Sequence, residues 1–325
     1  FINEAFKKGA SLAVVNKIDK SKKRNKQIKV ENTLTFLTKA SEIIRQNSLS
    51  KIIAITGSCG KTSLKELLSE TLSRFGNVSS SPKSFNNKYG VPLSLFNLNI
   101  NHEYGVFEAG MDKKGEIDRL TKIINPDVGI ITNISYAHAK NFKNINQIAL
   151  AKAEIINNIK PGGLIILNAD DSFFSLHKKI ALKKKLQVLT FGMYKKANVQ
   201  FRSISRNKND FKISVVINNK KTFFNLSSNF ENFIKNLLAV ITVISYFTDP
   251  FKLDKNIFRN FQTPEGRGDI SKIKINKKNI YLVDESYNSN PLSLKNAIQN
   301  FNMIKTRNKK YIILGDMMEL GRHSK

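Results

Sequence analysis

The sequence predicts an α/β protein built around a parallel sheet that is covered by helices. From Lys51 onward, short apolar runs with strand character alternate with segments of helical spacing, which is the pattern of a parallel sheet with crossover helices. One of these strands leads into a helix through a loop with two glycines and a lysine, as in phosphate-binding loops. With 325 residues, of which 41% are hydrophobic, the chain is long enough for two or three domains with packed cores.

The segment before Lys51 predicts a separate small unit. We expect a short helix at residues 2–9, a strand at 11–16 and a run rich in charges at 17–29. Residues 32–47 carry apolar side chains at helical spacing and predict a longer helix.

The central part supplies the predicted sheet. Its expected strands are residues 52–56, 105–108, 128–132, 164–167 and 187–191. Its expected helices are residues 62–75, 114–123 and 145–159. Residues 198–226 differ, because they predict two or three short strands with a turn near Asn218 and Asn219, which we interpret as an antiparallel edge.

The last part begins after a helix predicted at residues 233–247. The apolar stretch of that helix is too short to span a bilayer, so we expect no membrane insertion. Pro and Gly near 262–268 indicate a linker. Beyond it we expect strands at 270–275 and 279–283, a helix at 291–301 and a strand at 310–314. We therefore divide the chain into domains at 1–48, 49–262 and 263–325.

The net charge of +29 has two possible origins. Most of the basic residues are scattered lysines that accompany many Asn and Ile residues, whereas nucleic-acid-binding proteins usually gather basic residues on one face. We interpret the charge as compositional drift and expect no nucleic-acid partner, although it favours phosphorylated substrates. The one cysteine, Cys59, excludes intrachain disulfides and thiolate zinc clusters, which agrees with a cytoplasmic protein.

The glycine-containing loop is the strongest chemical motif. It consists of Gly57, Ser58, Cys59, Gly60, Lys61, Thr62 and Ser63. Glycines let backbone N–H groups curl around phosphate oxygens, and the start of the following helix adds partial positive charge. Lys61 is expected at the terminal phosphates and the Thr62 hydroxyl on Mg²⁺. Ile55 stands where the general pattern has its first glycine, so the motif is G-x-x-G-K-T, and we interpret Cys59 as a small accommodated residue.

Other polar residues belong to the same predicted crevice. Glu108 ends one strand and His138 follows another, and the C-terminal ends of parallel strands face the ligand crevice. Glu108 is therefore a candidate Mg²⁺ ligand, and His138 is a second candidate in the same crevice, although a histidine is an unusual ligand for an ion that prefers oxygen. Lys152 lies on a predicted helix. Taken alone, these three have ordinary explanations as a solvated carboxylate, a loop histidine and an exposed lysine. Arg267 in the linker is placed to reach a phosphate, and Asp284 begins a polar loop suited to ribose or substrate.

Together and in this order, these segments resemble the Mur ligase family of cell-wall synthesis, and within it the branch that adds D-alanyl-D-alanine. The resemblance rests on TGSCGKTS at 56–63, SFNNKYGVPL at 84–93, FEAGMDKKGEI at 107–117, LNADD at 167–171, DESYNSNP at 284–291 and LGDMMELG at 314–321. Shorter matches lie at 132–138, 151–155 and 266–268. The resemblance spans essentially the whole chain.

The resemblance implies a central phosphate-loop ATPase domain, preceded by the end of an N-terminal UDP-substrate-binding α/β domain and followed by the start of a C-terminal Rossmann-like α/β domain. We therefore expect the sequence to be a piece of a longer protein. It also implies that residues 57–63 bind the phosphates of ATP, that Asn236 contacts adenine, that Arg267 contacts the γ-phosphate and that Asp284 contacts the ribose.

The resemblance implies two Mg²⁺ ions as well. Thr62, Glu108 and His138 would hold the first ion, and Lys152, once carbamylated, would hold the second. The residues implied in catalysis are thus Lys61, Glu108, His138, Lys152 and Arg267.

The implied substrates are UDP-N-acetylmuramoyl-tripeptide and D-alanyl-D-alanine, and we expect a monomer. Substrate contacts are expected from Asn86, Asn87, Tyr287 and Asn288. The chain departs from the family where Asn232 and Phe233 replace the usual His and Asn, which puts that part of the nucleotide site in doubt. Three alternatives are another amino-acid ligase of the family, a basic ATP-dependent nucleic-acid-binding protein and a non-catalytic ATP-binding regulator.

Overall fold

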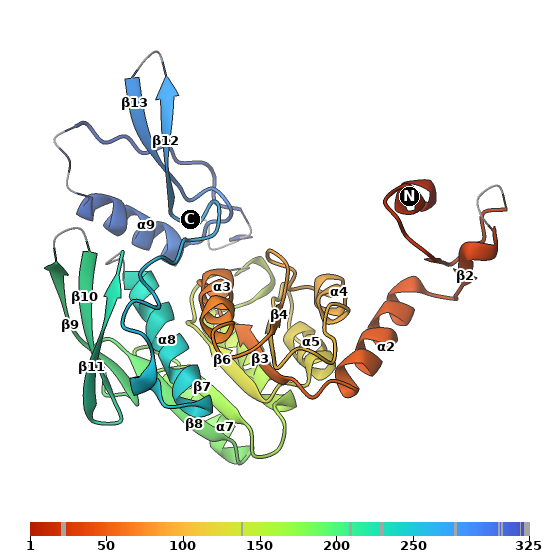
Figure 1. Cartoon of the computed structure of the whole chain (residues 1–325), viewed down its shortest axis with the longest axis horizontal. Helices are drawn as coiled ribbons and strands as arrows, with labels where there is room; N and C mark the ends of the chain where they lie inside the picture. Colours follow the sequence, from red (N-terminus) through yellow and green to blue (C-terminus); the bar gives the residue numbers. More distant parts are fainter. Residues whose placement is uncertain are drawn as a thin grey trace.

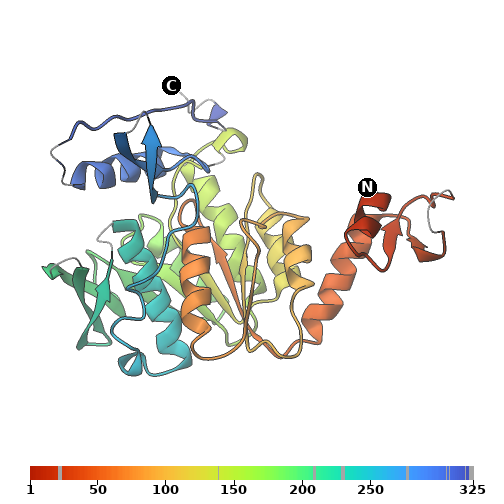
Figure 2. The same cartoon turned by 45° about the horizontal axis from the view of Figure 1, so that its top comes forward.

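The computed structural model describes residues 1–20, 24–137, 139–207, 210–227, 231–275, 278–304, 306, 308–318 and 320–321. Within these ranges the strands form a nine-stranded sheet and two two-stranded sheets. The large sheet occupies the middle of the molecule, and the residues before it extend from one side (Figure 1). The residues after it lie over the loops at one end of its strands (Figure 2).

The large sheet has the order β11-β10-β9-β8-β7-β6-β3-β5-β4. Its strands are β3 (Lys51–Thr56), β4 (Val78–Ser80), β5 (Tyr104–Glu108), β6 (Val128–Ile131), β7 (Leu164–Asn168), β8 (Gln187–Gly192), β9 (Val199–Asn207), β10 (Asp210–Ile217) and β11 (Lys220–Leu226). Pairing is parallel from β4 through β9. Because β3 pairs with β5 on one side and β6 on the other, the crevice at its carboxyl end lies where the strand order reverses, the usual place for a ligand in such sheets.

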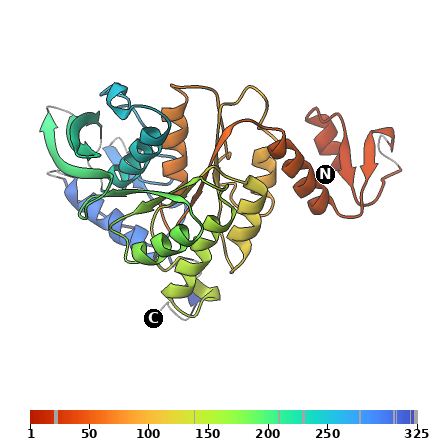
Figure 3. The ribbon, with the colours of Figure 1, turned by 90° about the horizontal axis from the view of Figure 1, so that it is seen from below.

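Helices cover both faces of this sheet. One face packs against α3 (Lys61–Leu72) and α8 (Glu231–Phe247), which contact each other. The other face packs against α4 (Gly90–Leu95), α5 (Glu116–Ile124), α6 (Ile145–Ala153) with its 3₁₀ extension Glu154–Asn158, and α7 (Phe174–Lys183). The view from below shows the sheet between these two layers (Figure 3).

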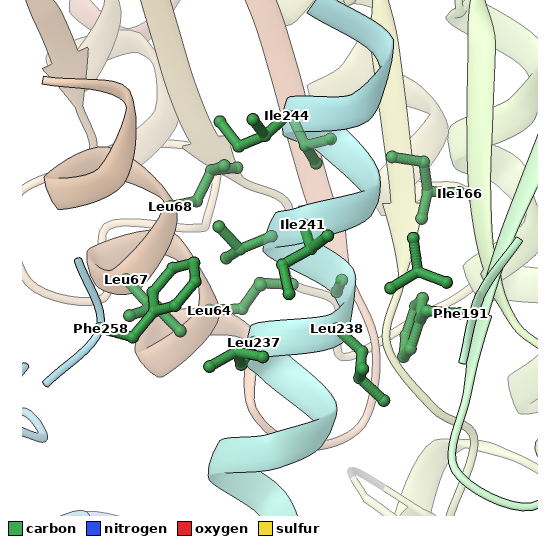
Figure 4. Close-up of a cluster of buried hydrophobic side chains, with 14 of the residues drawn as sticks. Leu64, Leu67, Leu68, Ile166, Phe191, Leu237, Leu238, Ile241, Ile244 and Phe258 are labelled. Atoms are coloured by element: carbon green, nitrogen blue, oxygen red, sulfur yellow. The ribbon is translucent and has the colours of Figure 1, made fainter. Parts of the chain in front are cut away.

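Strand β3 illustrates why both faces are apolar. Ile53 and Ile55 belong to the cluster beneath α3 and α8, whereas Ile52 and Ala54 belong to the cluster on the opposite face. Successive residues of a strand point to opposite faces, so a continuous apolar run suits a strand covered on both sides. Figure 4 shows α8 filling the space between α3 and the strands with leucine and isoleucine side chains.

The antiparallel edge predicted for residues 198–226 is confirmed. β9, β10 and β11 pair antiparallel, and β10 connects to β11 through Asn218 and Asn219, which both have positive φ. Two such residues are what a tight hairpin turn of this hand requires, and asparagine tolerates the conformation.

The segment before the sheet contains more structure than predicted. It comprises α1 (Ile2–Lys7), β1 (Ala13–Val15), a 3₁₀ turn at Arg24–Lys26, β2 (Gln27–Lys29) and α2 (Thr33–Gln46). The two helices and β1 agree with the predictions, whereas β2 lies in the charged run and was not expected. It pairs with β1 in parallel, and this pairing is a tertiary contact that local sequence does not reveal.

The segment after the sheet contains β12 (Asp269–Ile275), β13 (Lys278–Asp284) and α9 (Pro291–Met303), as predicted. The strand expected at 310–314 is wrong, because none of the described residues 308–318 is in a strand. A strand needs a hydrogen-bonded neighbour, and β12 and β13 pair only with each other. The sequence analysis also did not predict β4, α4 and α7.

The predicted apolar helix of α8 is buried, with Leu237, Leu238, Val240 and Ile241 fully enclosed. Within the ranges described, no helix combines the length and the apolar character needed to cross a bilayer. The domain limits at 48 and 262 remain predictions.

Candidate active site

A cavity of about 850 Å³ opens at the carboxyl end of β3. It lies between the phosphate loop, the segment after β4 and the loops around β12 and β13. The sequence-predicted residues that line it are Ser58, Cys59, Gly60, Lys61, Thr62, Ser63, Asn86, Asn87, Asn236, Arg267, Tyr287 and Asn288. The structure therefore brings together residues from the second and third predicted domains.

The phosphate loop is held in shape from β6. Gly57 has φ of +147°, and a Cβ at this position would lie 1.8 Å from Thr132 Oγ1, so only glycine fits. Thr132 Oγ1 donates to Cys59 O over 2.7 Å, and Asn133 Oδ1 accepts from Cys59 N over 3.0 Å. Gly60, with φ of +81°, is the N-cap residue that precedes α3. These contacts fix the conformation of the loop at the wall of the cavity.

Two lysines meet at one carbonyl of the loop. Lys61 Nζ donates to Gly57 O over 2.8 Å, and Lys152 Nζ, from α6, donates to the same oxygen over 3.0 Å. Lys152 is only 2% exposed, so it is not the exposed helix lysine that its sequence position alone suggested. Burial, followed by the nearby Lys61 ammonium, lowers the pKa of Lys152 well below its usual value. Burial also lowers the pKa of Lys61, opposed by Glu108 and Cys59.

Glu108 is fully buried, which excludes the interpretation of its side chain as a solvated carboxylate at the end of a strand. Its Oε2 accepts from Thr62 Oγ1 over 3.2 Å and from Asn86 Nδ2 over 3.4 Å. Its Oε1 lies 3.7 Å from Lys65 Nζ but accepts no hydrogen bond from any residue that the structure describes. A buried carboxylate oxygen without a hydrogen-bond donor is costly unless a charge completes it.

The side chains at this edge fit a magnesium ion. Thr62 and Glu108 supply the oxygen donors that Mg²⁺ prefers, and the free Oε1 of Glu108 leaves a coordination position. No group of three or more His, Cys, Asp or Glu side chains that could hold a metal gathers here or elsewhere among the described residues. His138 lies outside those residues, so its predicted role stays a prediction. Lys152 as an amine is no ligand for Mg²⁺, and only its carbamate would be one.

Arg267 reaches the same edge from the segment after the sheet. Its Nη2 donates to Ser84 Oγ over 3.1 Å, and Ser84 Oγ lies 3.1 Å from Thr62 Oγ1. The guanidinium lies over the ring of Tyr287 at 4.1 Å from the centroid. The flanking Gly266 and Gly268 both have positive φ, which lets the linker bend tightly at Arg267.

The residues at the end of β13 and in the loop that follows differ in how close they lie to the cavity. Asp284 does not line the cavity, and its Oδ1 accepts from Ser286 N over 2.8 Å, whereas the next residue, Glu285, does line it. Asn290 contacts the phosphate loop directly, since its Nδ2 donates to Cys59 Sγ over 3.0 Å. The predicted ribose contact of Asp284 therefore remains a prediction, with Glu285 nearer to the cavity.

Phe233, one of the two residues that depart from the family pattern, forms an aromatic contact. Phe233 is buried and stacks on Phe261 at 5.7 Å between centroids, and both line the cavity near Asn236. Asn236 lies against the start of α3, since its Oδ1 would be 3.3 Å from a Cβ on Gly60. The side chain of Asn232 lies outside what the structure describes.

Sequence reasoning missed several residues of this site. Thr132 and Asn133 shape the loop, Ser84 joins Thr62 to Arg267, and Lys65 lies beside Glu108. Thr132 and Asn133 lie at a strand end, so they could have been predicted by the same rule as His138, that residues at the carboxyl ends of parallel strands face the ligand crevice. A lysine in the interior of a helix carries no comparable signal.

Comparison with known proteins decides the family. The Mur ligase middle domain matches residues 55–244. The UDP-N-acetylmuramoyl-tripeptide–D-alanyl-D-alanine ligase of Buchnera aphidicola subsp. Baizongia pistaciae is 33% identical over 99% of this chain and 69% of its own length. The corresponding Bacillus subtilis protein is 30% identical over 99% and 68%.

The chain belongs to the Mur ligase family. Solved structures agree with this assignment. MurF from Acinetobacter baumannii superposes with a TM-score of 0.85 at 28% identity, covering 99% of this chain and 69% of that one. The MurF ligase of Thermotoga maritima in complex with ADP gives 0.84 at 26% identity, covering 100% and 73%. As a Mur ligase, the chain is a nucleotide-binding ligase.

Proposed function

We propose that this Mur ligase joins D-alanyl-D-alanine to UDP-N-acetylmuramoyl-tripeptide with ATP, as the names of its relatives state for those proteins. The observation that carries the proposal is the convergence of Lys61, Thr62, Glu108 and Arg267 at one edge of the cavity. The same names favour this activity over another amino-acid ligase. We further propose that it acts as a cytoplasmic monomer, without a nucleic-acid partner.

The reaction has two steps. In the first, the terminal carboxylate of the tripeptide attacks the γ-phosphorus of ATP, a carboxylate O–P bond forms, and ADP leaves. In the second, the amine of D-alanyl-D-alanine attacks the acyl carbon, loses a proton and displaces inorganic phosphate. Phosphoryl transfer of this kind depends on alignment and charge neutralisation rather than on covalent help from the protein.

The residues of the site suit the first step. Two anions approach each other, and the ammonium of Lys61 and the guanidinium of Arg267 stand at the cavity edge to offset that charge. Lys61 would exchange its bond to Gly57 O for a phosphate oxygen. Thr62 and Glu108 would hold Mg²⁺, which when bound neutralises phosphate charge.

The second step needs a site closed to water, because an acyl phosphate hydrolyses readily. Arg267 already joins the segment after the sheet to the segment after β4, and Asn290 joins it to the phosphate loop. Asn86 and Asn87 on one wall and Asn288 on the other supply amide groups for the peptide substrates. Enclosure between these walls would exclude water from the intermediate.

The test is phosphate release and product formation with ATP, Mg²⁺, UDP-N-acetylmuramoyl-tripeptide and D-alanyl-D-alanine. Lys61→Ala should lower kcat by at least ~100-fold, because it removes a cation from the transferring phosphoryl group. Its fold, followed by circular dichroism, should be kept. Turnover near the wild-type rate in Lys61→Ala would contradict the assignment of the phosphate loop. Phosphate release that does not depend on UDP-N-acetylmuramoyl-tripeptide and D-alanyl-D-alanine would contradict the proposed activity.

A further inference from the structure

Lys65 is a buried cation that the proposed reaction does not use. It lies on α3, one turn after Lys61, and is 0% exposed. Lysine is almost never fully buried unless its ammonium is paired. Here the ammonium donates to the backbone oxygens of Ser81 and Lys83 and forms an ion pair with Glu66 Oε1 at 2.8 Å.

The two backbone oxygens belong to one tight turn that follows β4. Phe85 N donates to Pro82 O over 3.1 Å across the turn, and Lys83 has φ of +47°, a conformation that a lysine rarely adopts. Both carbonyls point inward to the same ammonium. The turn therefore winds around the end of the Lys65 side chain, which compensates for its unfavourable backbone conformation.

The turn and the residues just after it carry two side chains of the site. Ser84 Oγ lies 3.1 Å from Thr62 Oγ1 and accepts from Arg267 Nη2 over 3.1 Å. Asn86 Nδ2 donates to Glu108 Oε2 over 3.4 Å. A shift of the turn would thus move the partners of Thr62, Arg267 and Glu108 at the same time.

We propose that Lys65 is a positioning residue of the nucleotide and metal edge. Its ammonium holds the turn at residues 81–85, and the turn places Ser84 and Asn86 against the groups that bind phosphate and Mg²⁺. This inference rests on the proposed function, because it takes residues 57–63 as the site of a nucleotide. Lys65 itself acts only through its neighbours.

A cation is needed at this place for a physical reason. An apolar side chain of similar size would leave the oxygens of Ser81 and Lys83 without a donor inside the protein, and it would remove the positive charge 3.7 Å from Glu108 Oε1. The turn would then relax toward solvent to satisfy its carbonyls. That relaxation carries Ser84 away from Thr62.

The test measures binding of ADP with Mg²⁺ by isothermal titration calorimetry, independently of turnover. Lys65→Met should raise the Kd at least tenfold. Lys65→Gln keeps two N–H donors without the charge and should raise the Kd less than Lys65→Met does. It also provides a test if Lys65→Met does not fold. Ser84→Ala should raise the Kd about threefold, and Lys65→Met with Ser84→Ala should bind no more weakly than Lys65→Met alone, because both act through the same turn.

Thr71→Val is the matched control. Thr71 is buried on the same helix, and its hydroxyl donates to Leu67 O over 2.7 Å rather than to an atom of the turn. This variant should lower the Tm and leave the Kd unchanged. The proposal is overturned if Lys65→Met only lowers the Tm, or if its effect multiplies with that of Ser84→Ala. Wild-type protein that fails to bind ADP with Mg²⁺ would instead refute the proposed function, and this inference with it.

Discussion

At the scale of single residues, the unusual feature is the pair of lysines on one carbonyl. Lys61 and Lys152 both donate to Gly57 O, and burial keeps the pKa of each below its ordinary value. An amine must lose its proton before it can attack carbon dioxide, so a lowered pKa extends the pH range in which that attack is possible. The location of Lys152 therefore suits the carbamylation that the family resemblance implies.

We expect Lys152 to form a carbamate when the protein is equilibrated with ¹³C-labelled bicarbonate. The carbamate carbon should appear in the ¹³C spectrum near neutral pH and fade as the pH falls, because protonation removes the nucleophilic amine. An exposed lysine would lose the signal at a higher pH. Lys152→Arg is the matched control, since it keeps a cation but cannot be carbamylated. A signal that survives in Lys152→Arg, or no signal in the wild type at alkaline pH, would refute the prediction.

At the scale of elements, the residue that caps α9 also joins this helix to the phosphate loop. Asn290 caps this helix, since its Oδ1 accepts from Leu292 N and Ser293 N, and the Ser293 hydroxyl accepts from Asn290 N. No residue of α9 itself is buried. The same Asn290 side chain donates to Cys59 Sγ, so the cap also joins the helix to the phosphate loop.

Asn290→Ala should lower the free energy of unfolding by ~1 kcal/mol through the lost cap and should speed the reaction of Cys59 with a maleimide. Cys59 is the chain's one cysteine, so labelling reports on this loop alone. Asn290→Asp keeps the cap but loses the N–H donor, and should speed labelling without the loss of stability. Equal labelling rates in all three proteins would show that the contact does not protect the thiol.

Elements also show where local sequence stops being informative. The start of α5 has no capping side chain of its own, because Gly115 precedes it. Glu154, from the end of α6, accepts from Gly115 N over 2.8 Å and from Asp118 N over 3.2 Å instead. Burial raises the pKa of Glu154, with these two hydrogen bonds opposing the shift. A cap supplied across such a sequence separation cannot be predicted from the helix it caps.

At the scale of the whole molecule, Arg45 joins the N-terminal segment to the central sheet. It is buried near the end of α2, and it donates through Nε to Ile124 O and through Nη2 to Asn125 O, each over 2.8 Å. Asp127 Oδ2 lies 3.7 Å from Nη2. The guanidinium thus caps the end of α5 and holds α2 against it.

Arg45→Met should lower the free energy of unfolding by about 2–4 kcal/mol, because it leaves the carbonyls of α5 without donors in a buried place. Hydrogen exchange of the α2 amides should accelerate more than exchange in β3. Lys8→Met is the control, since its pair with Glu4 is exposed and contributes little. Unchanged exchange in α2 would mean that other contacts carry the docking.

Some residues of the candidate site could be predicted from the sequence, and others could not. The phosphate loop was found because strand, glycines, lysine and helix are adjacent in the chain, and the structure lines the cavity with it. Glu108 and Lys152 each had a stronger ordinary explanation until the resemblance connected them. Lys65 and Ser84 were missed, because their roles come from contacts between α3, the turn after β4 and Arg267, which lie far apart in sequence.

The sequence by itself determined the α/β class, the alternation of strands and helices, the antiparallel edge and the nucleotide loop. Each of these depends on spacing between near neighbours, such as a period of two for strands or a glycine before a helix. The tertiary structure alone decided which charges are buried, which carbonyls they satisfy and which strands find a partner. Residues 310–314 have strand-forming side chains but no paired neighbour, and Lys152 has the sequence of an exposed helix residue but lies behind Gly57. Burial and pairing arise only when distant segments meet, so no local pattern encodes them.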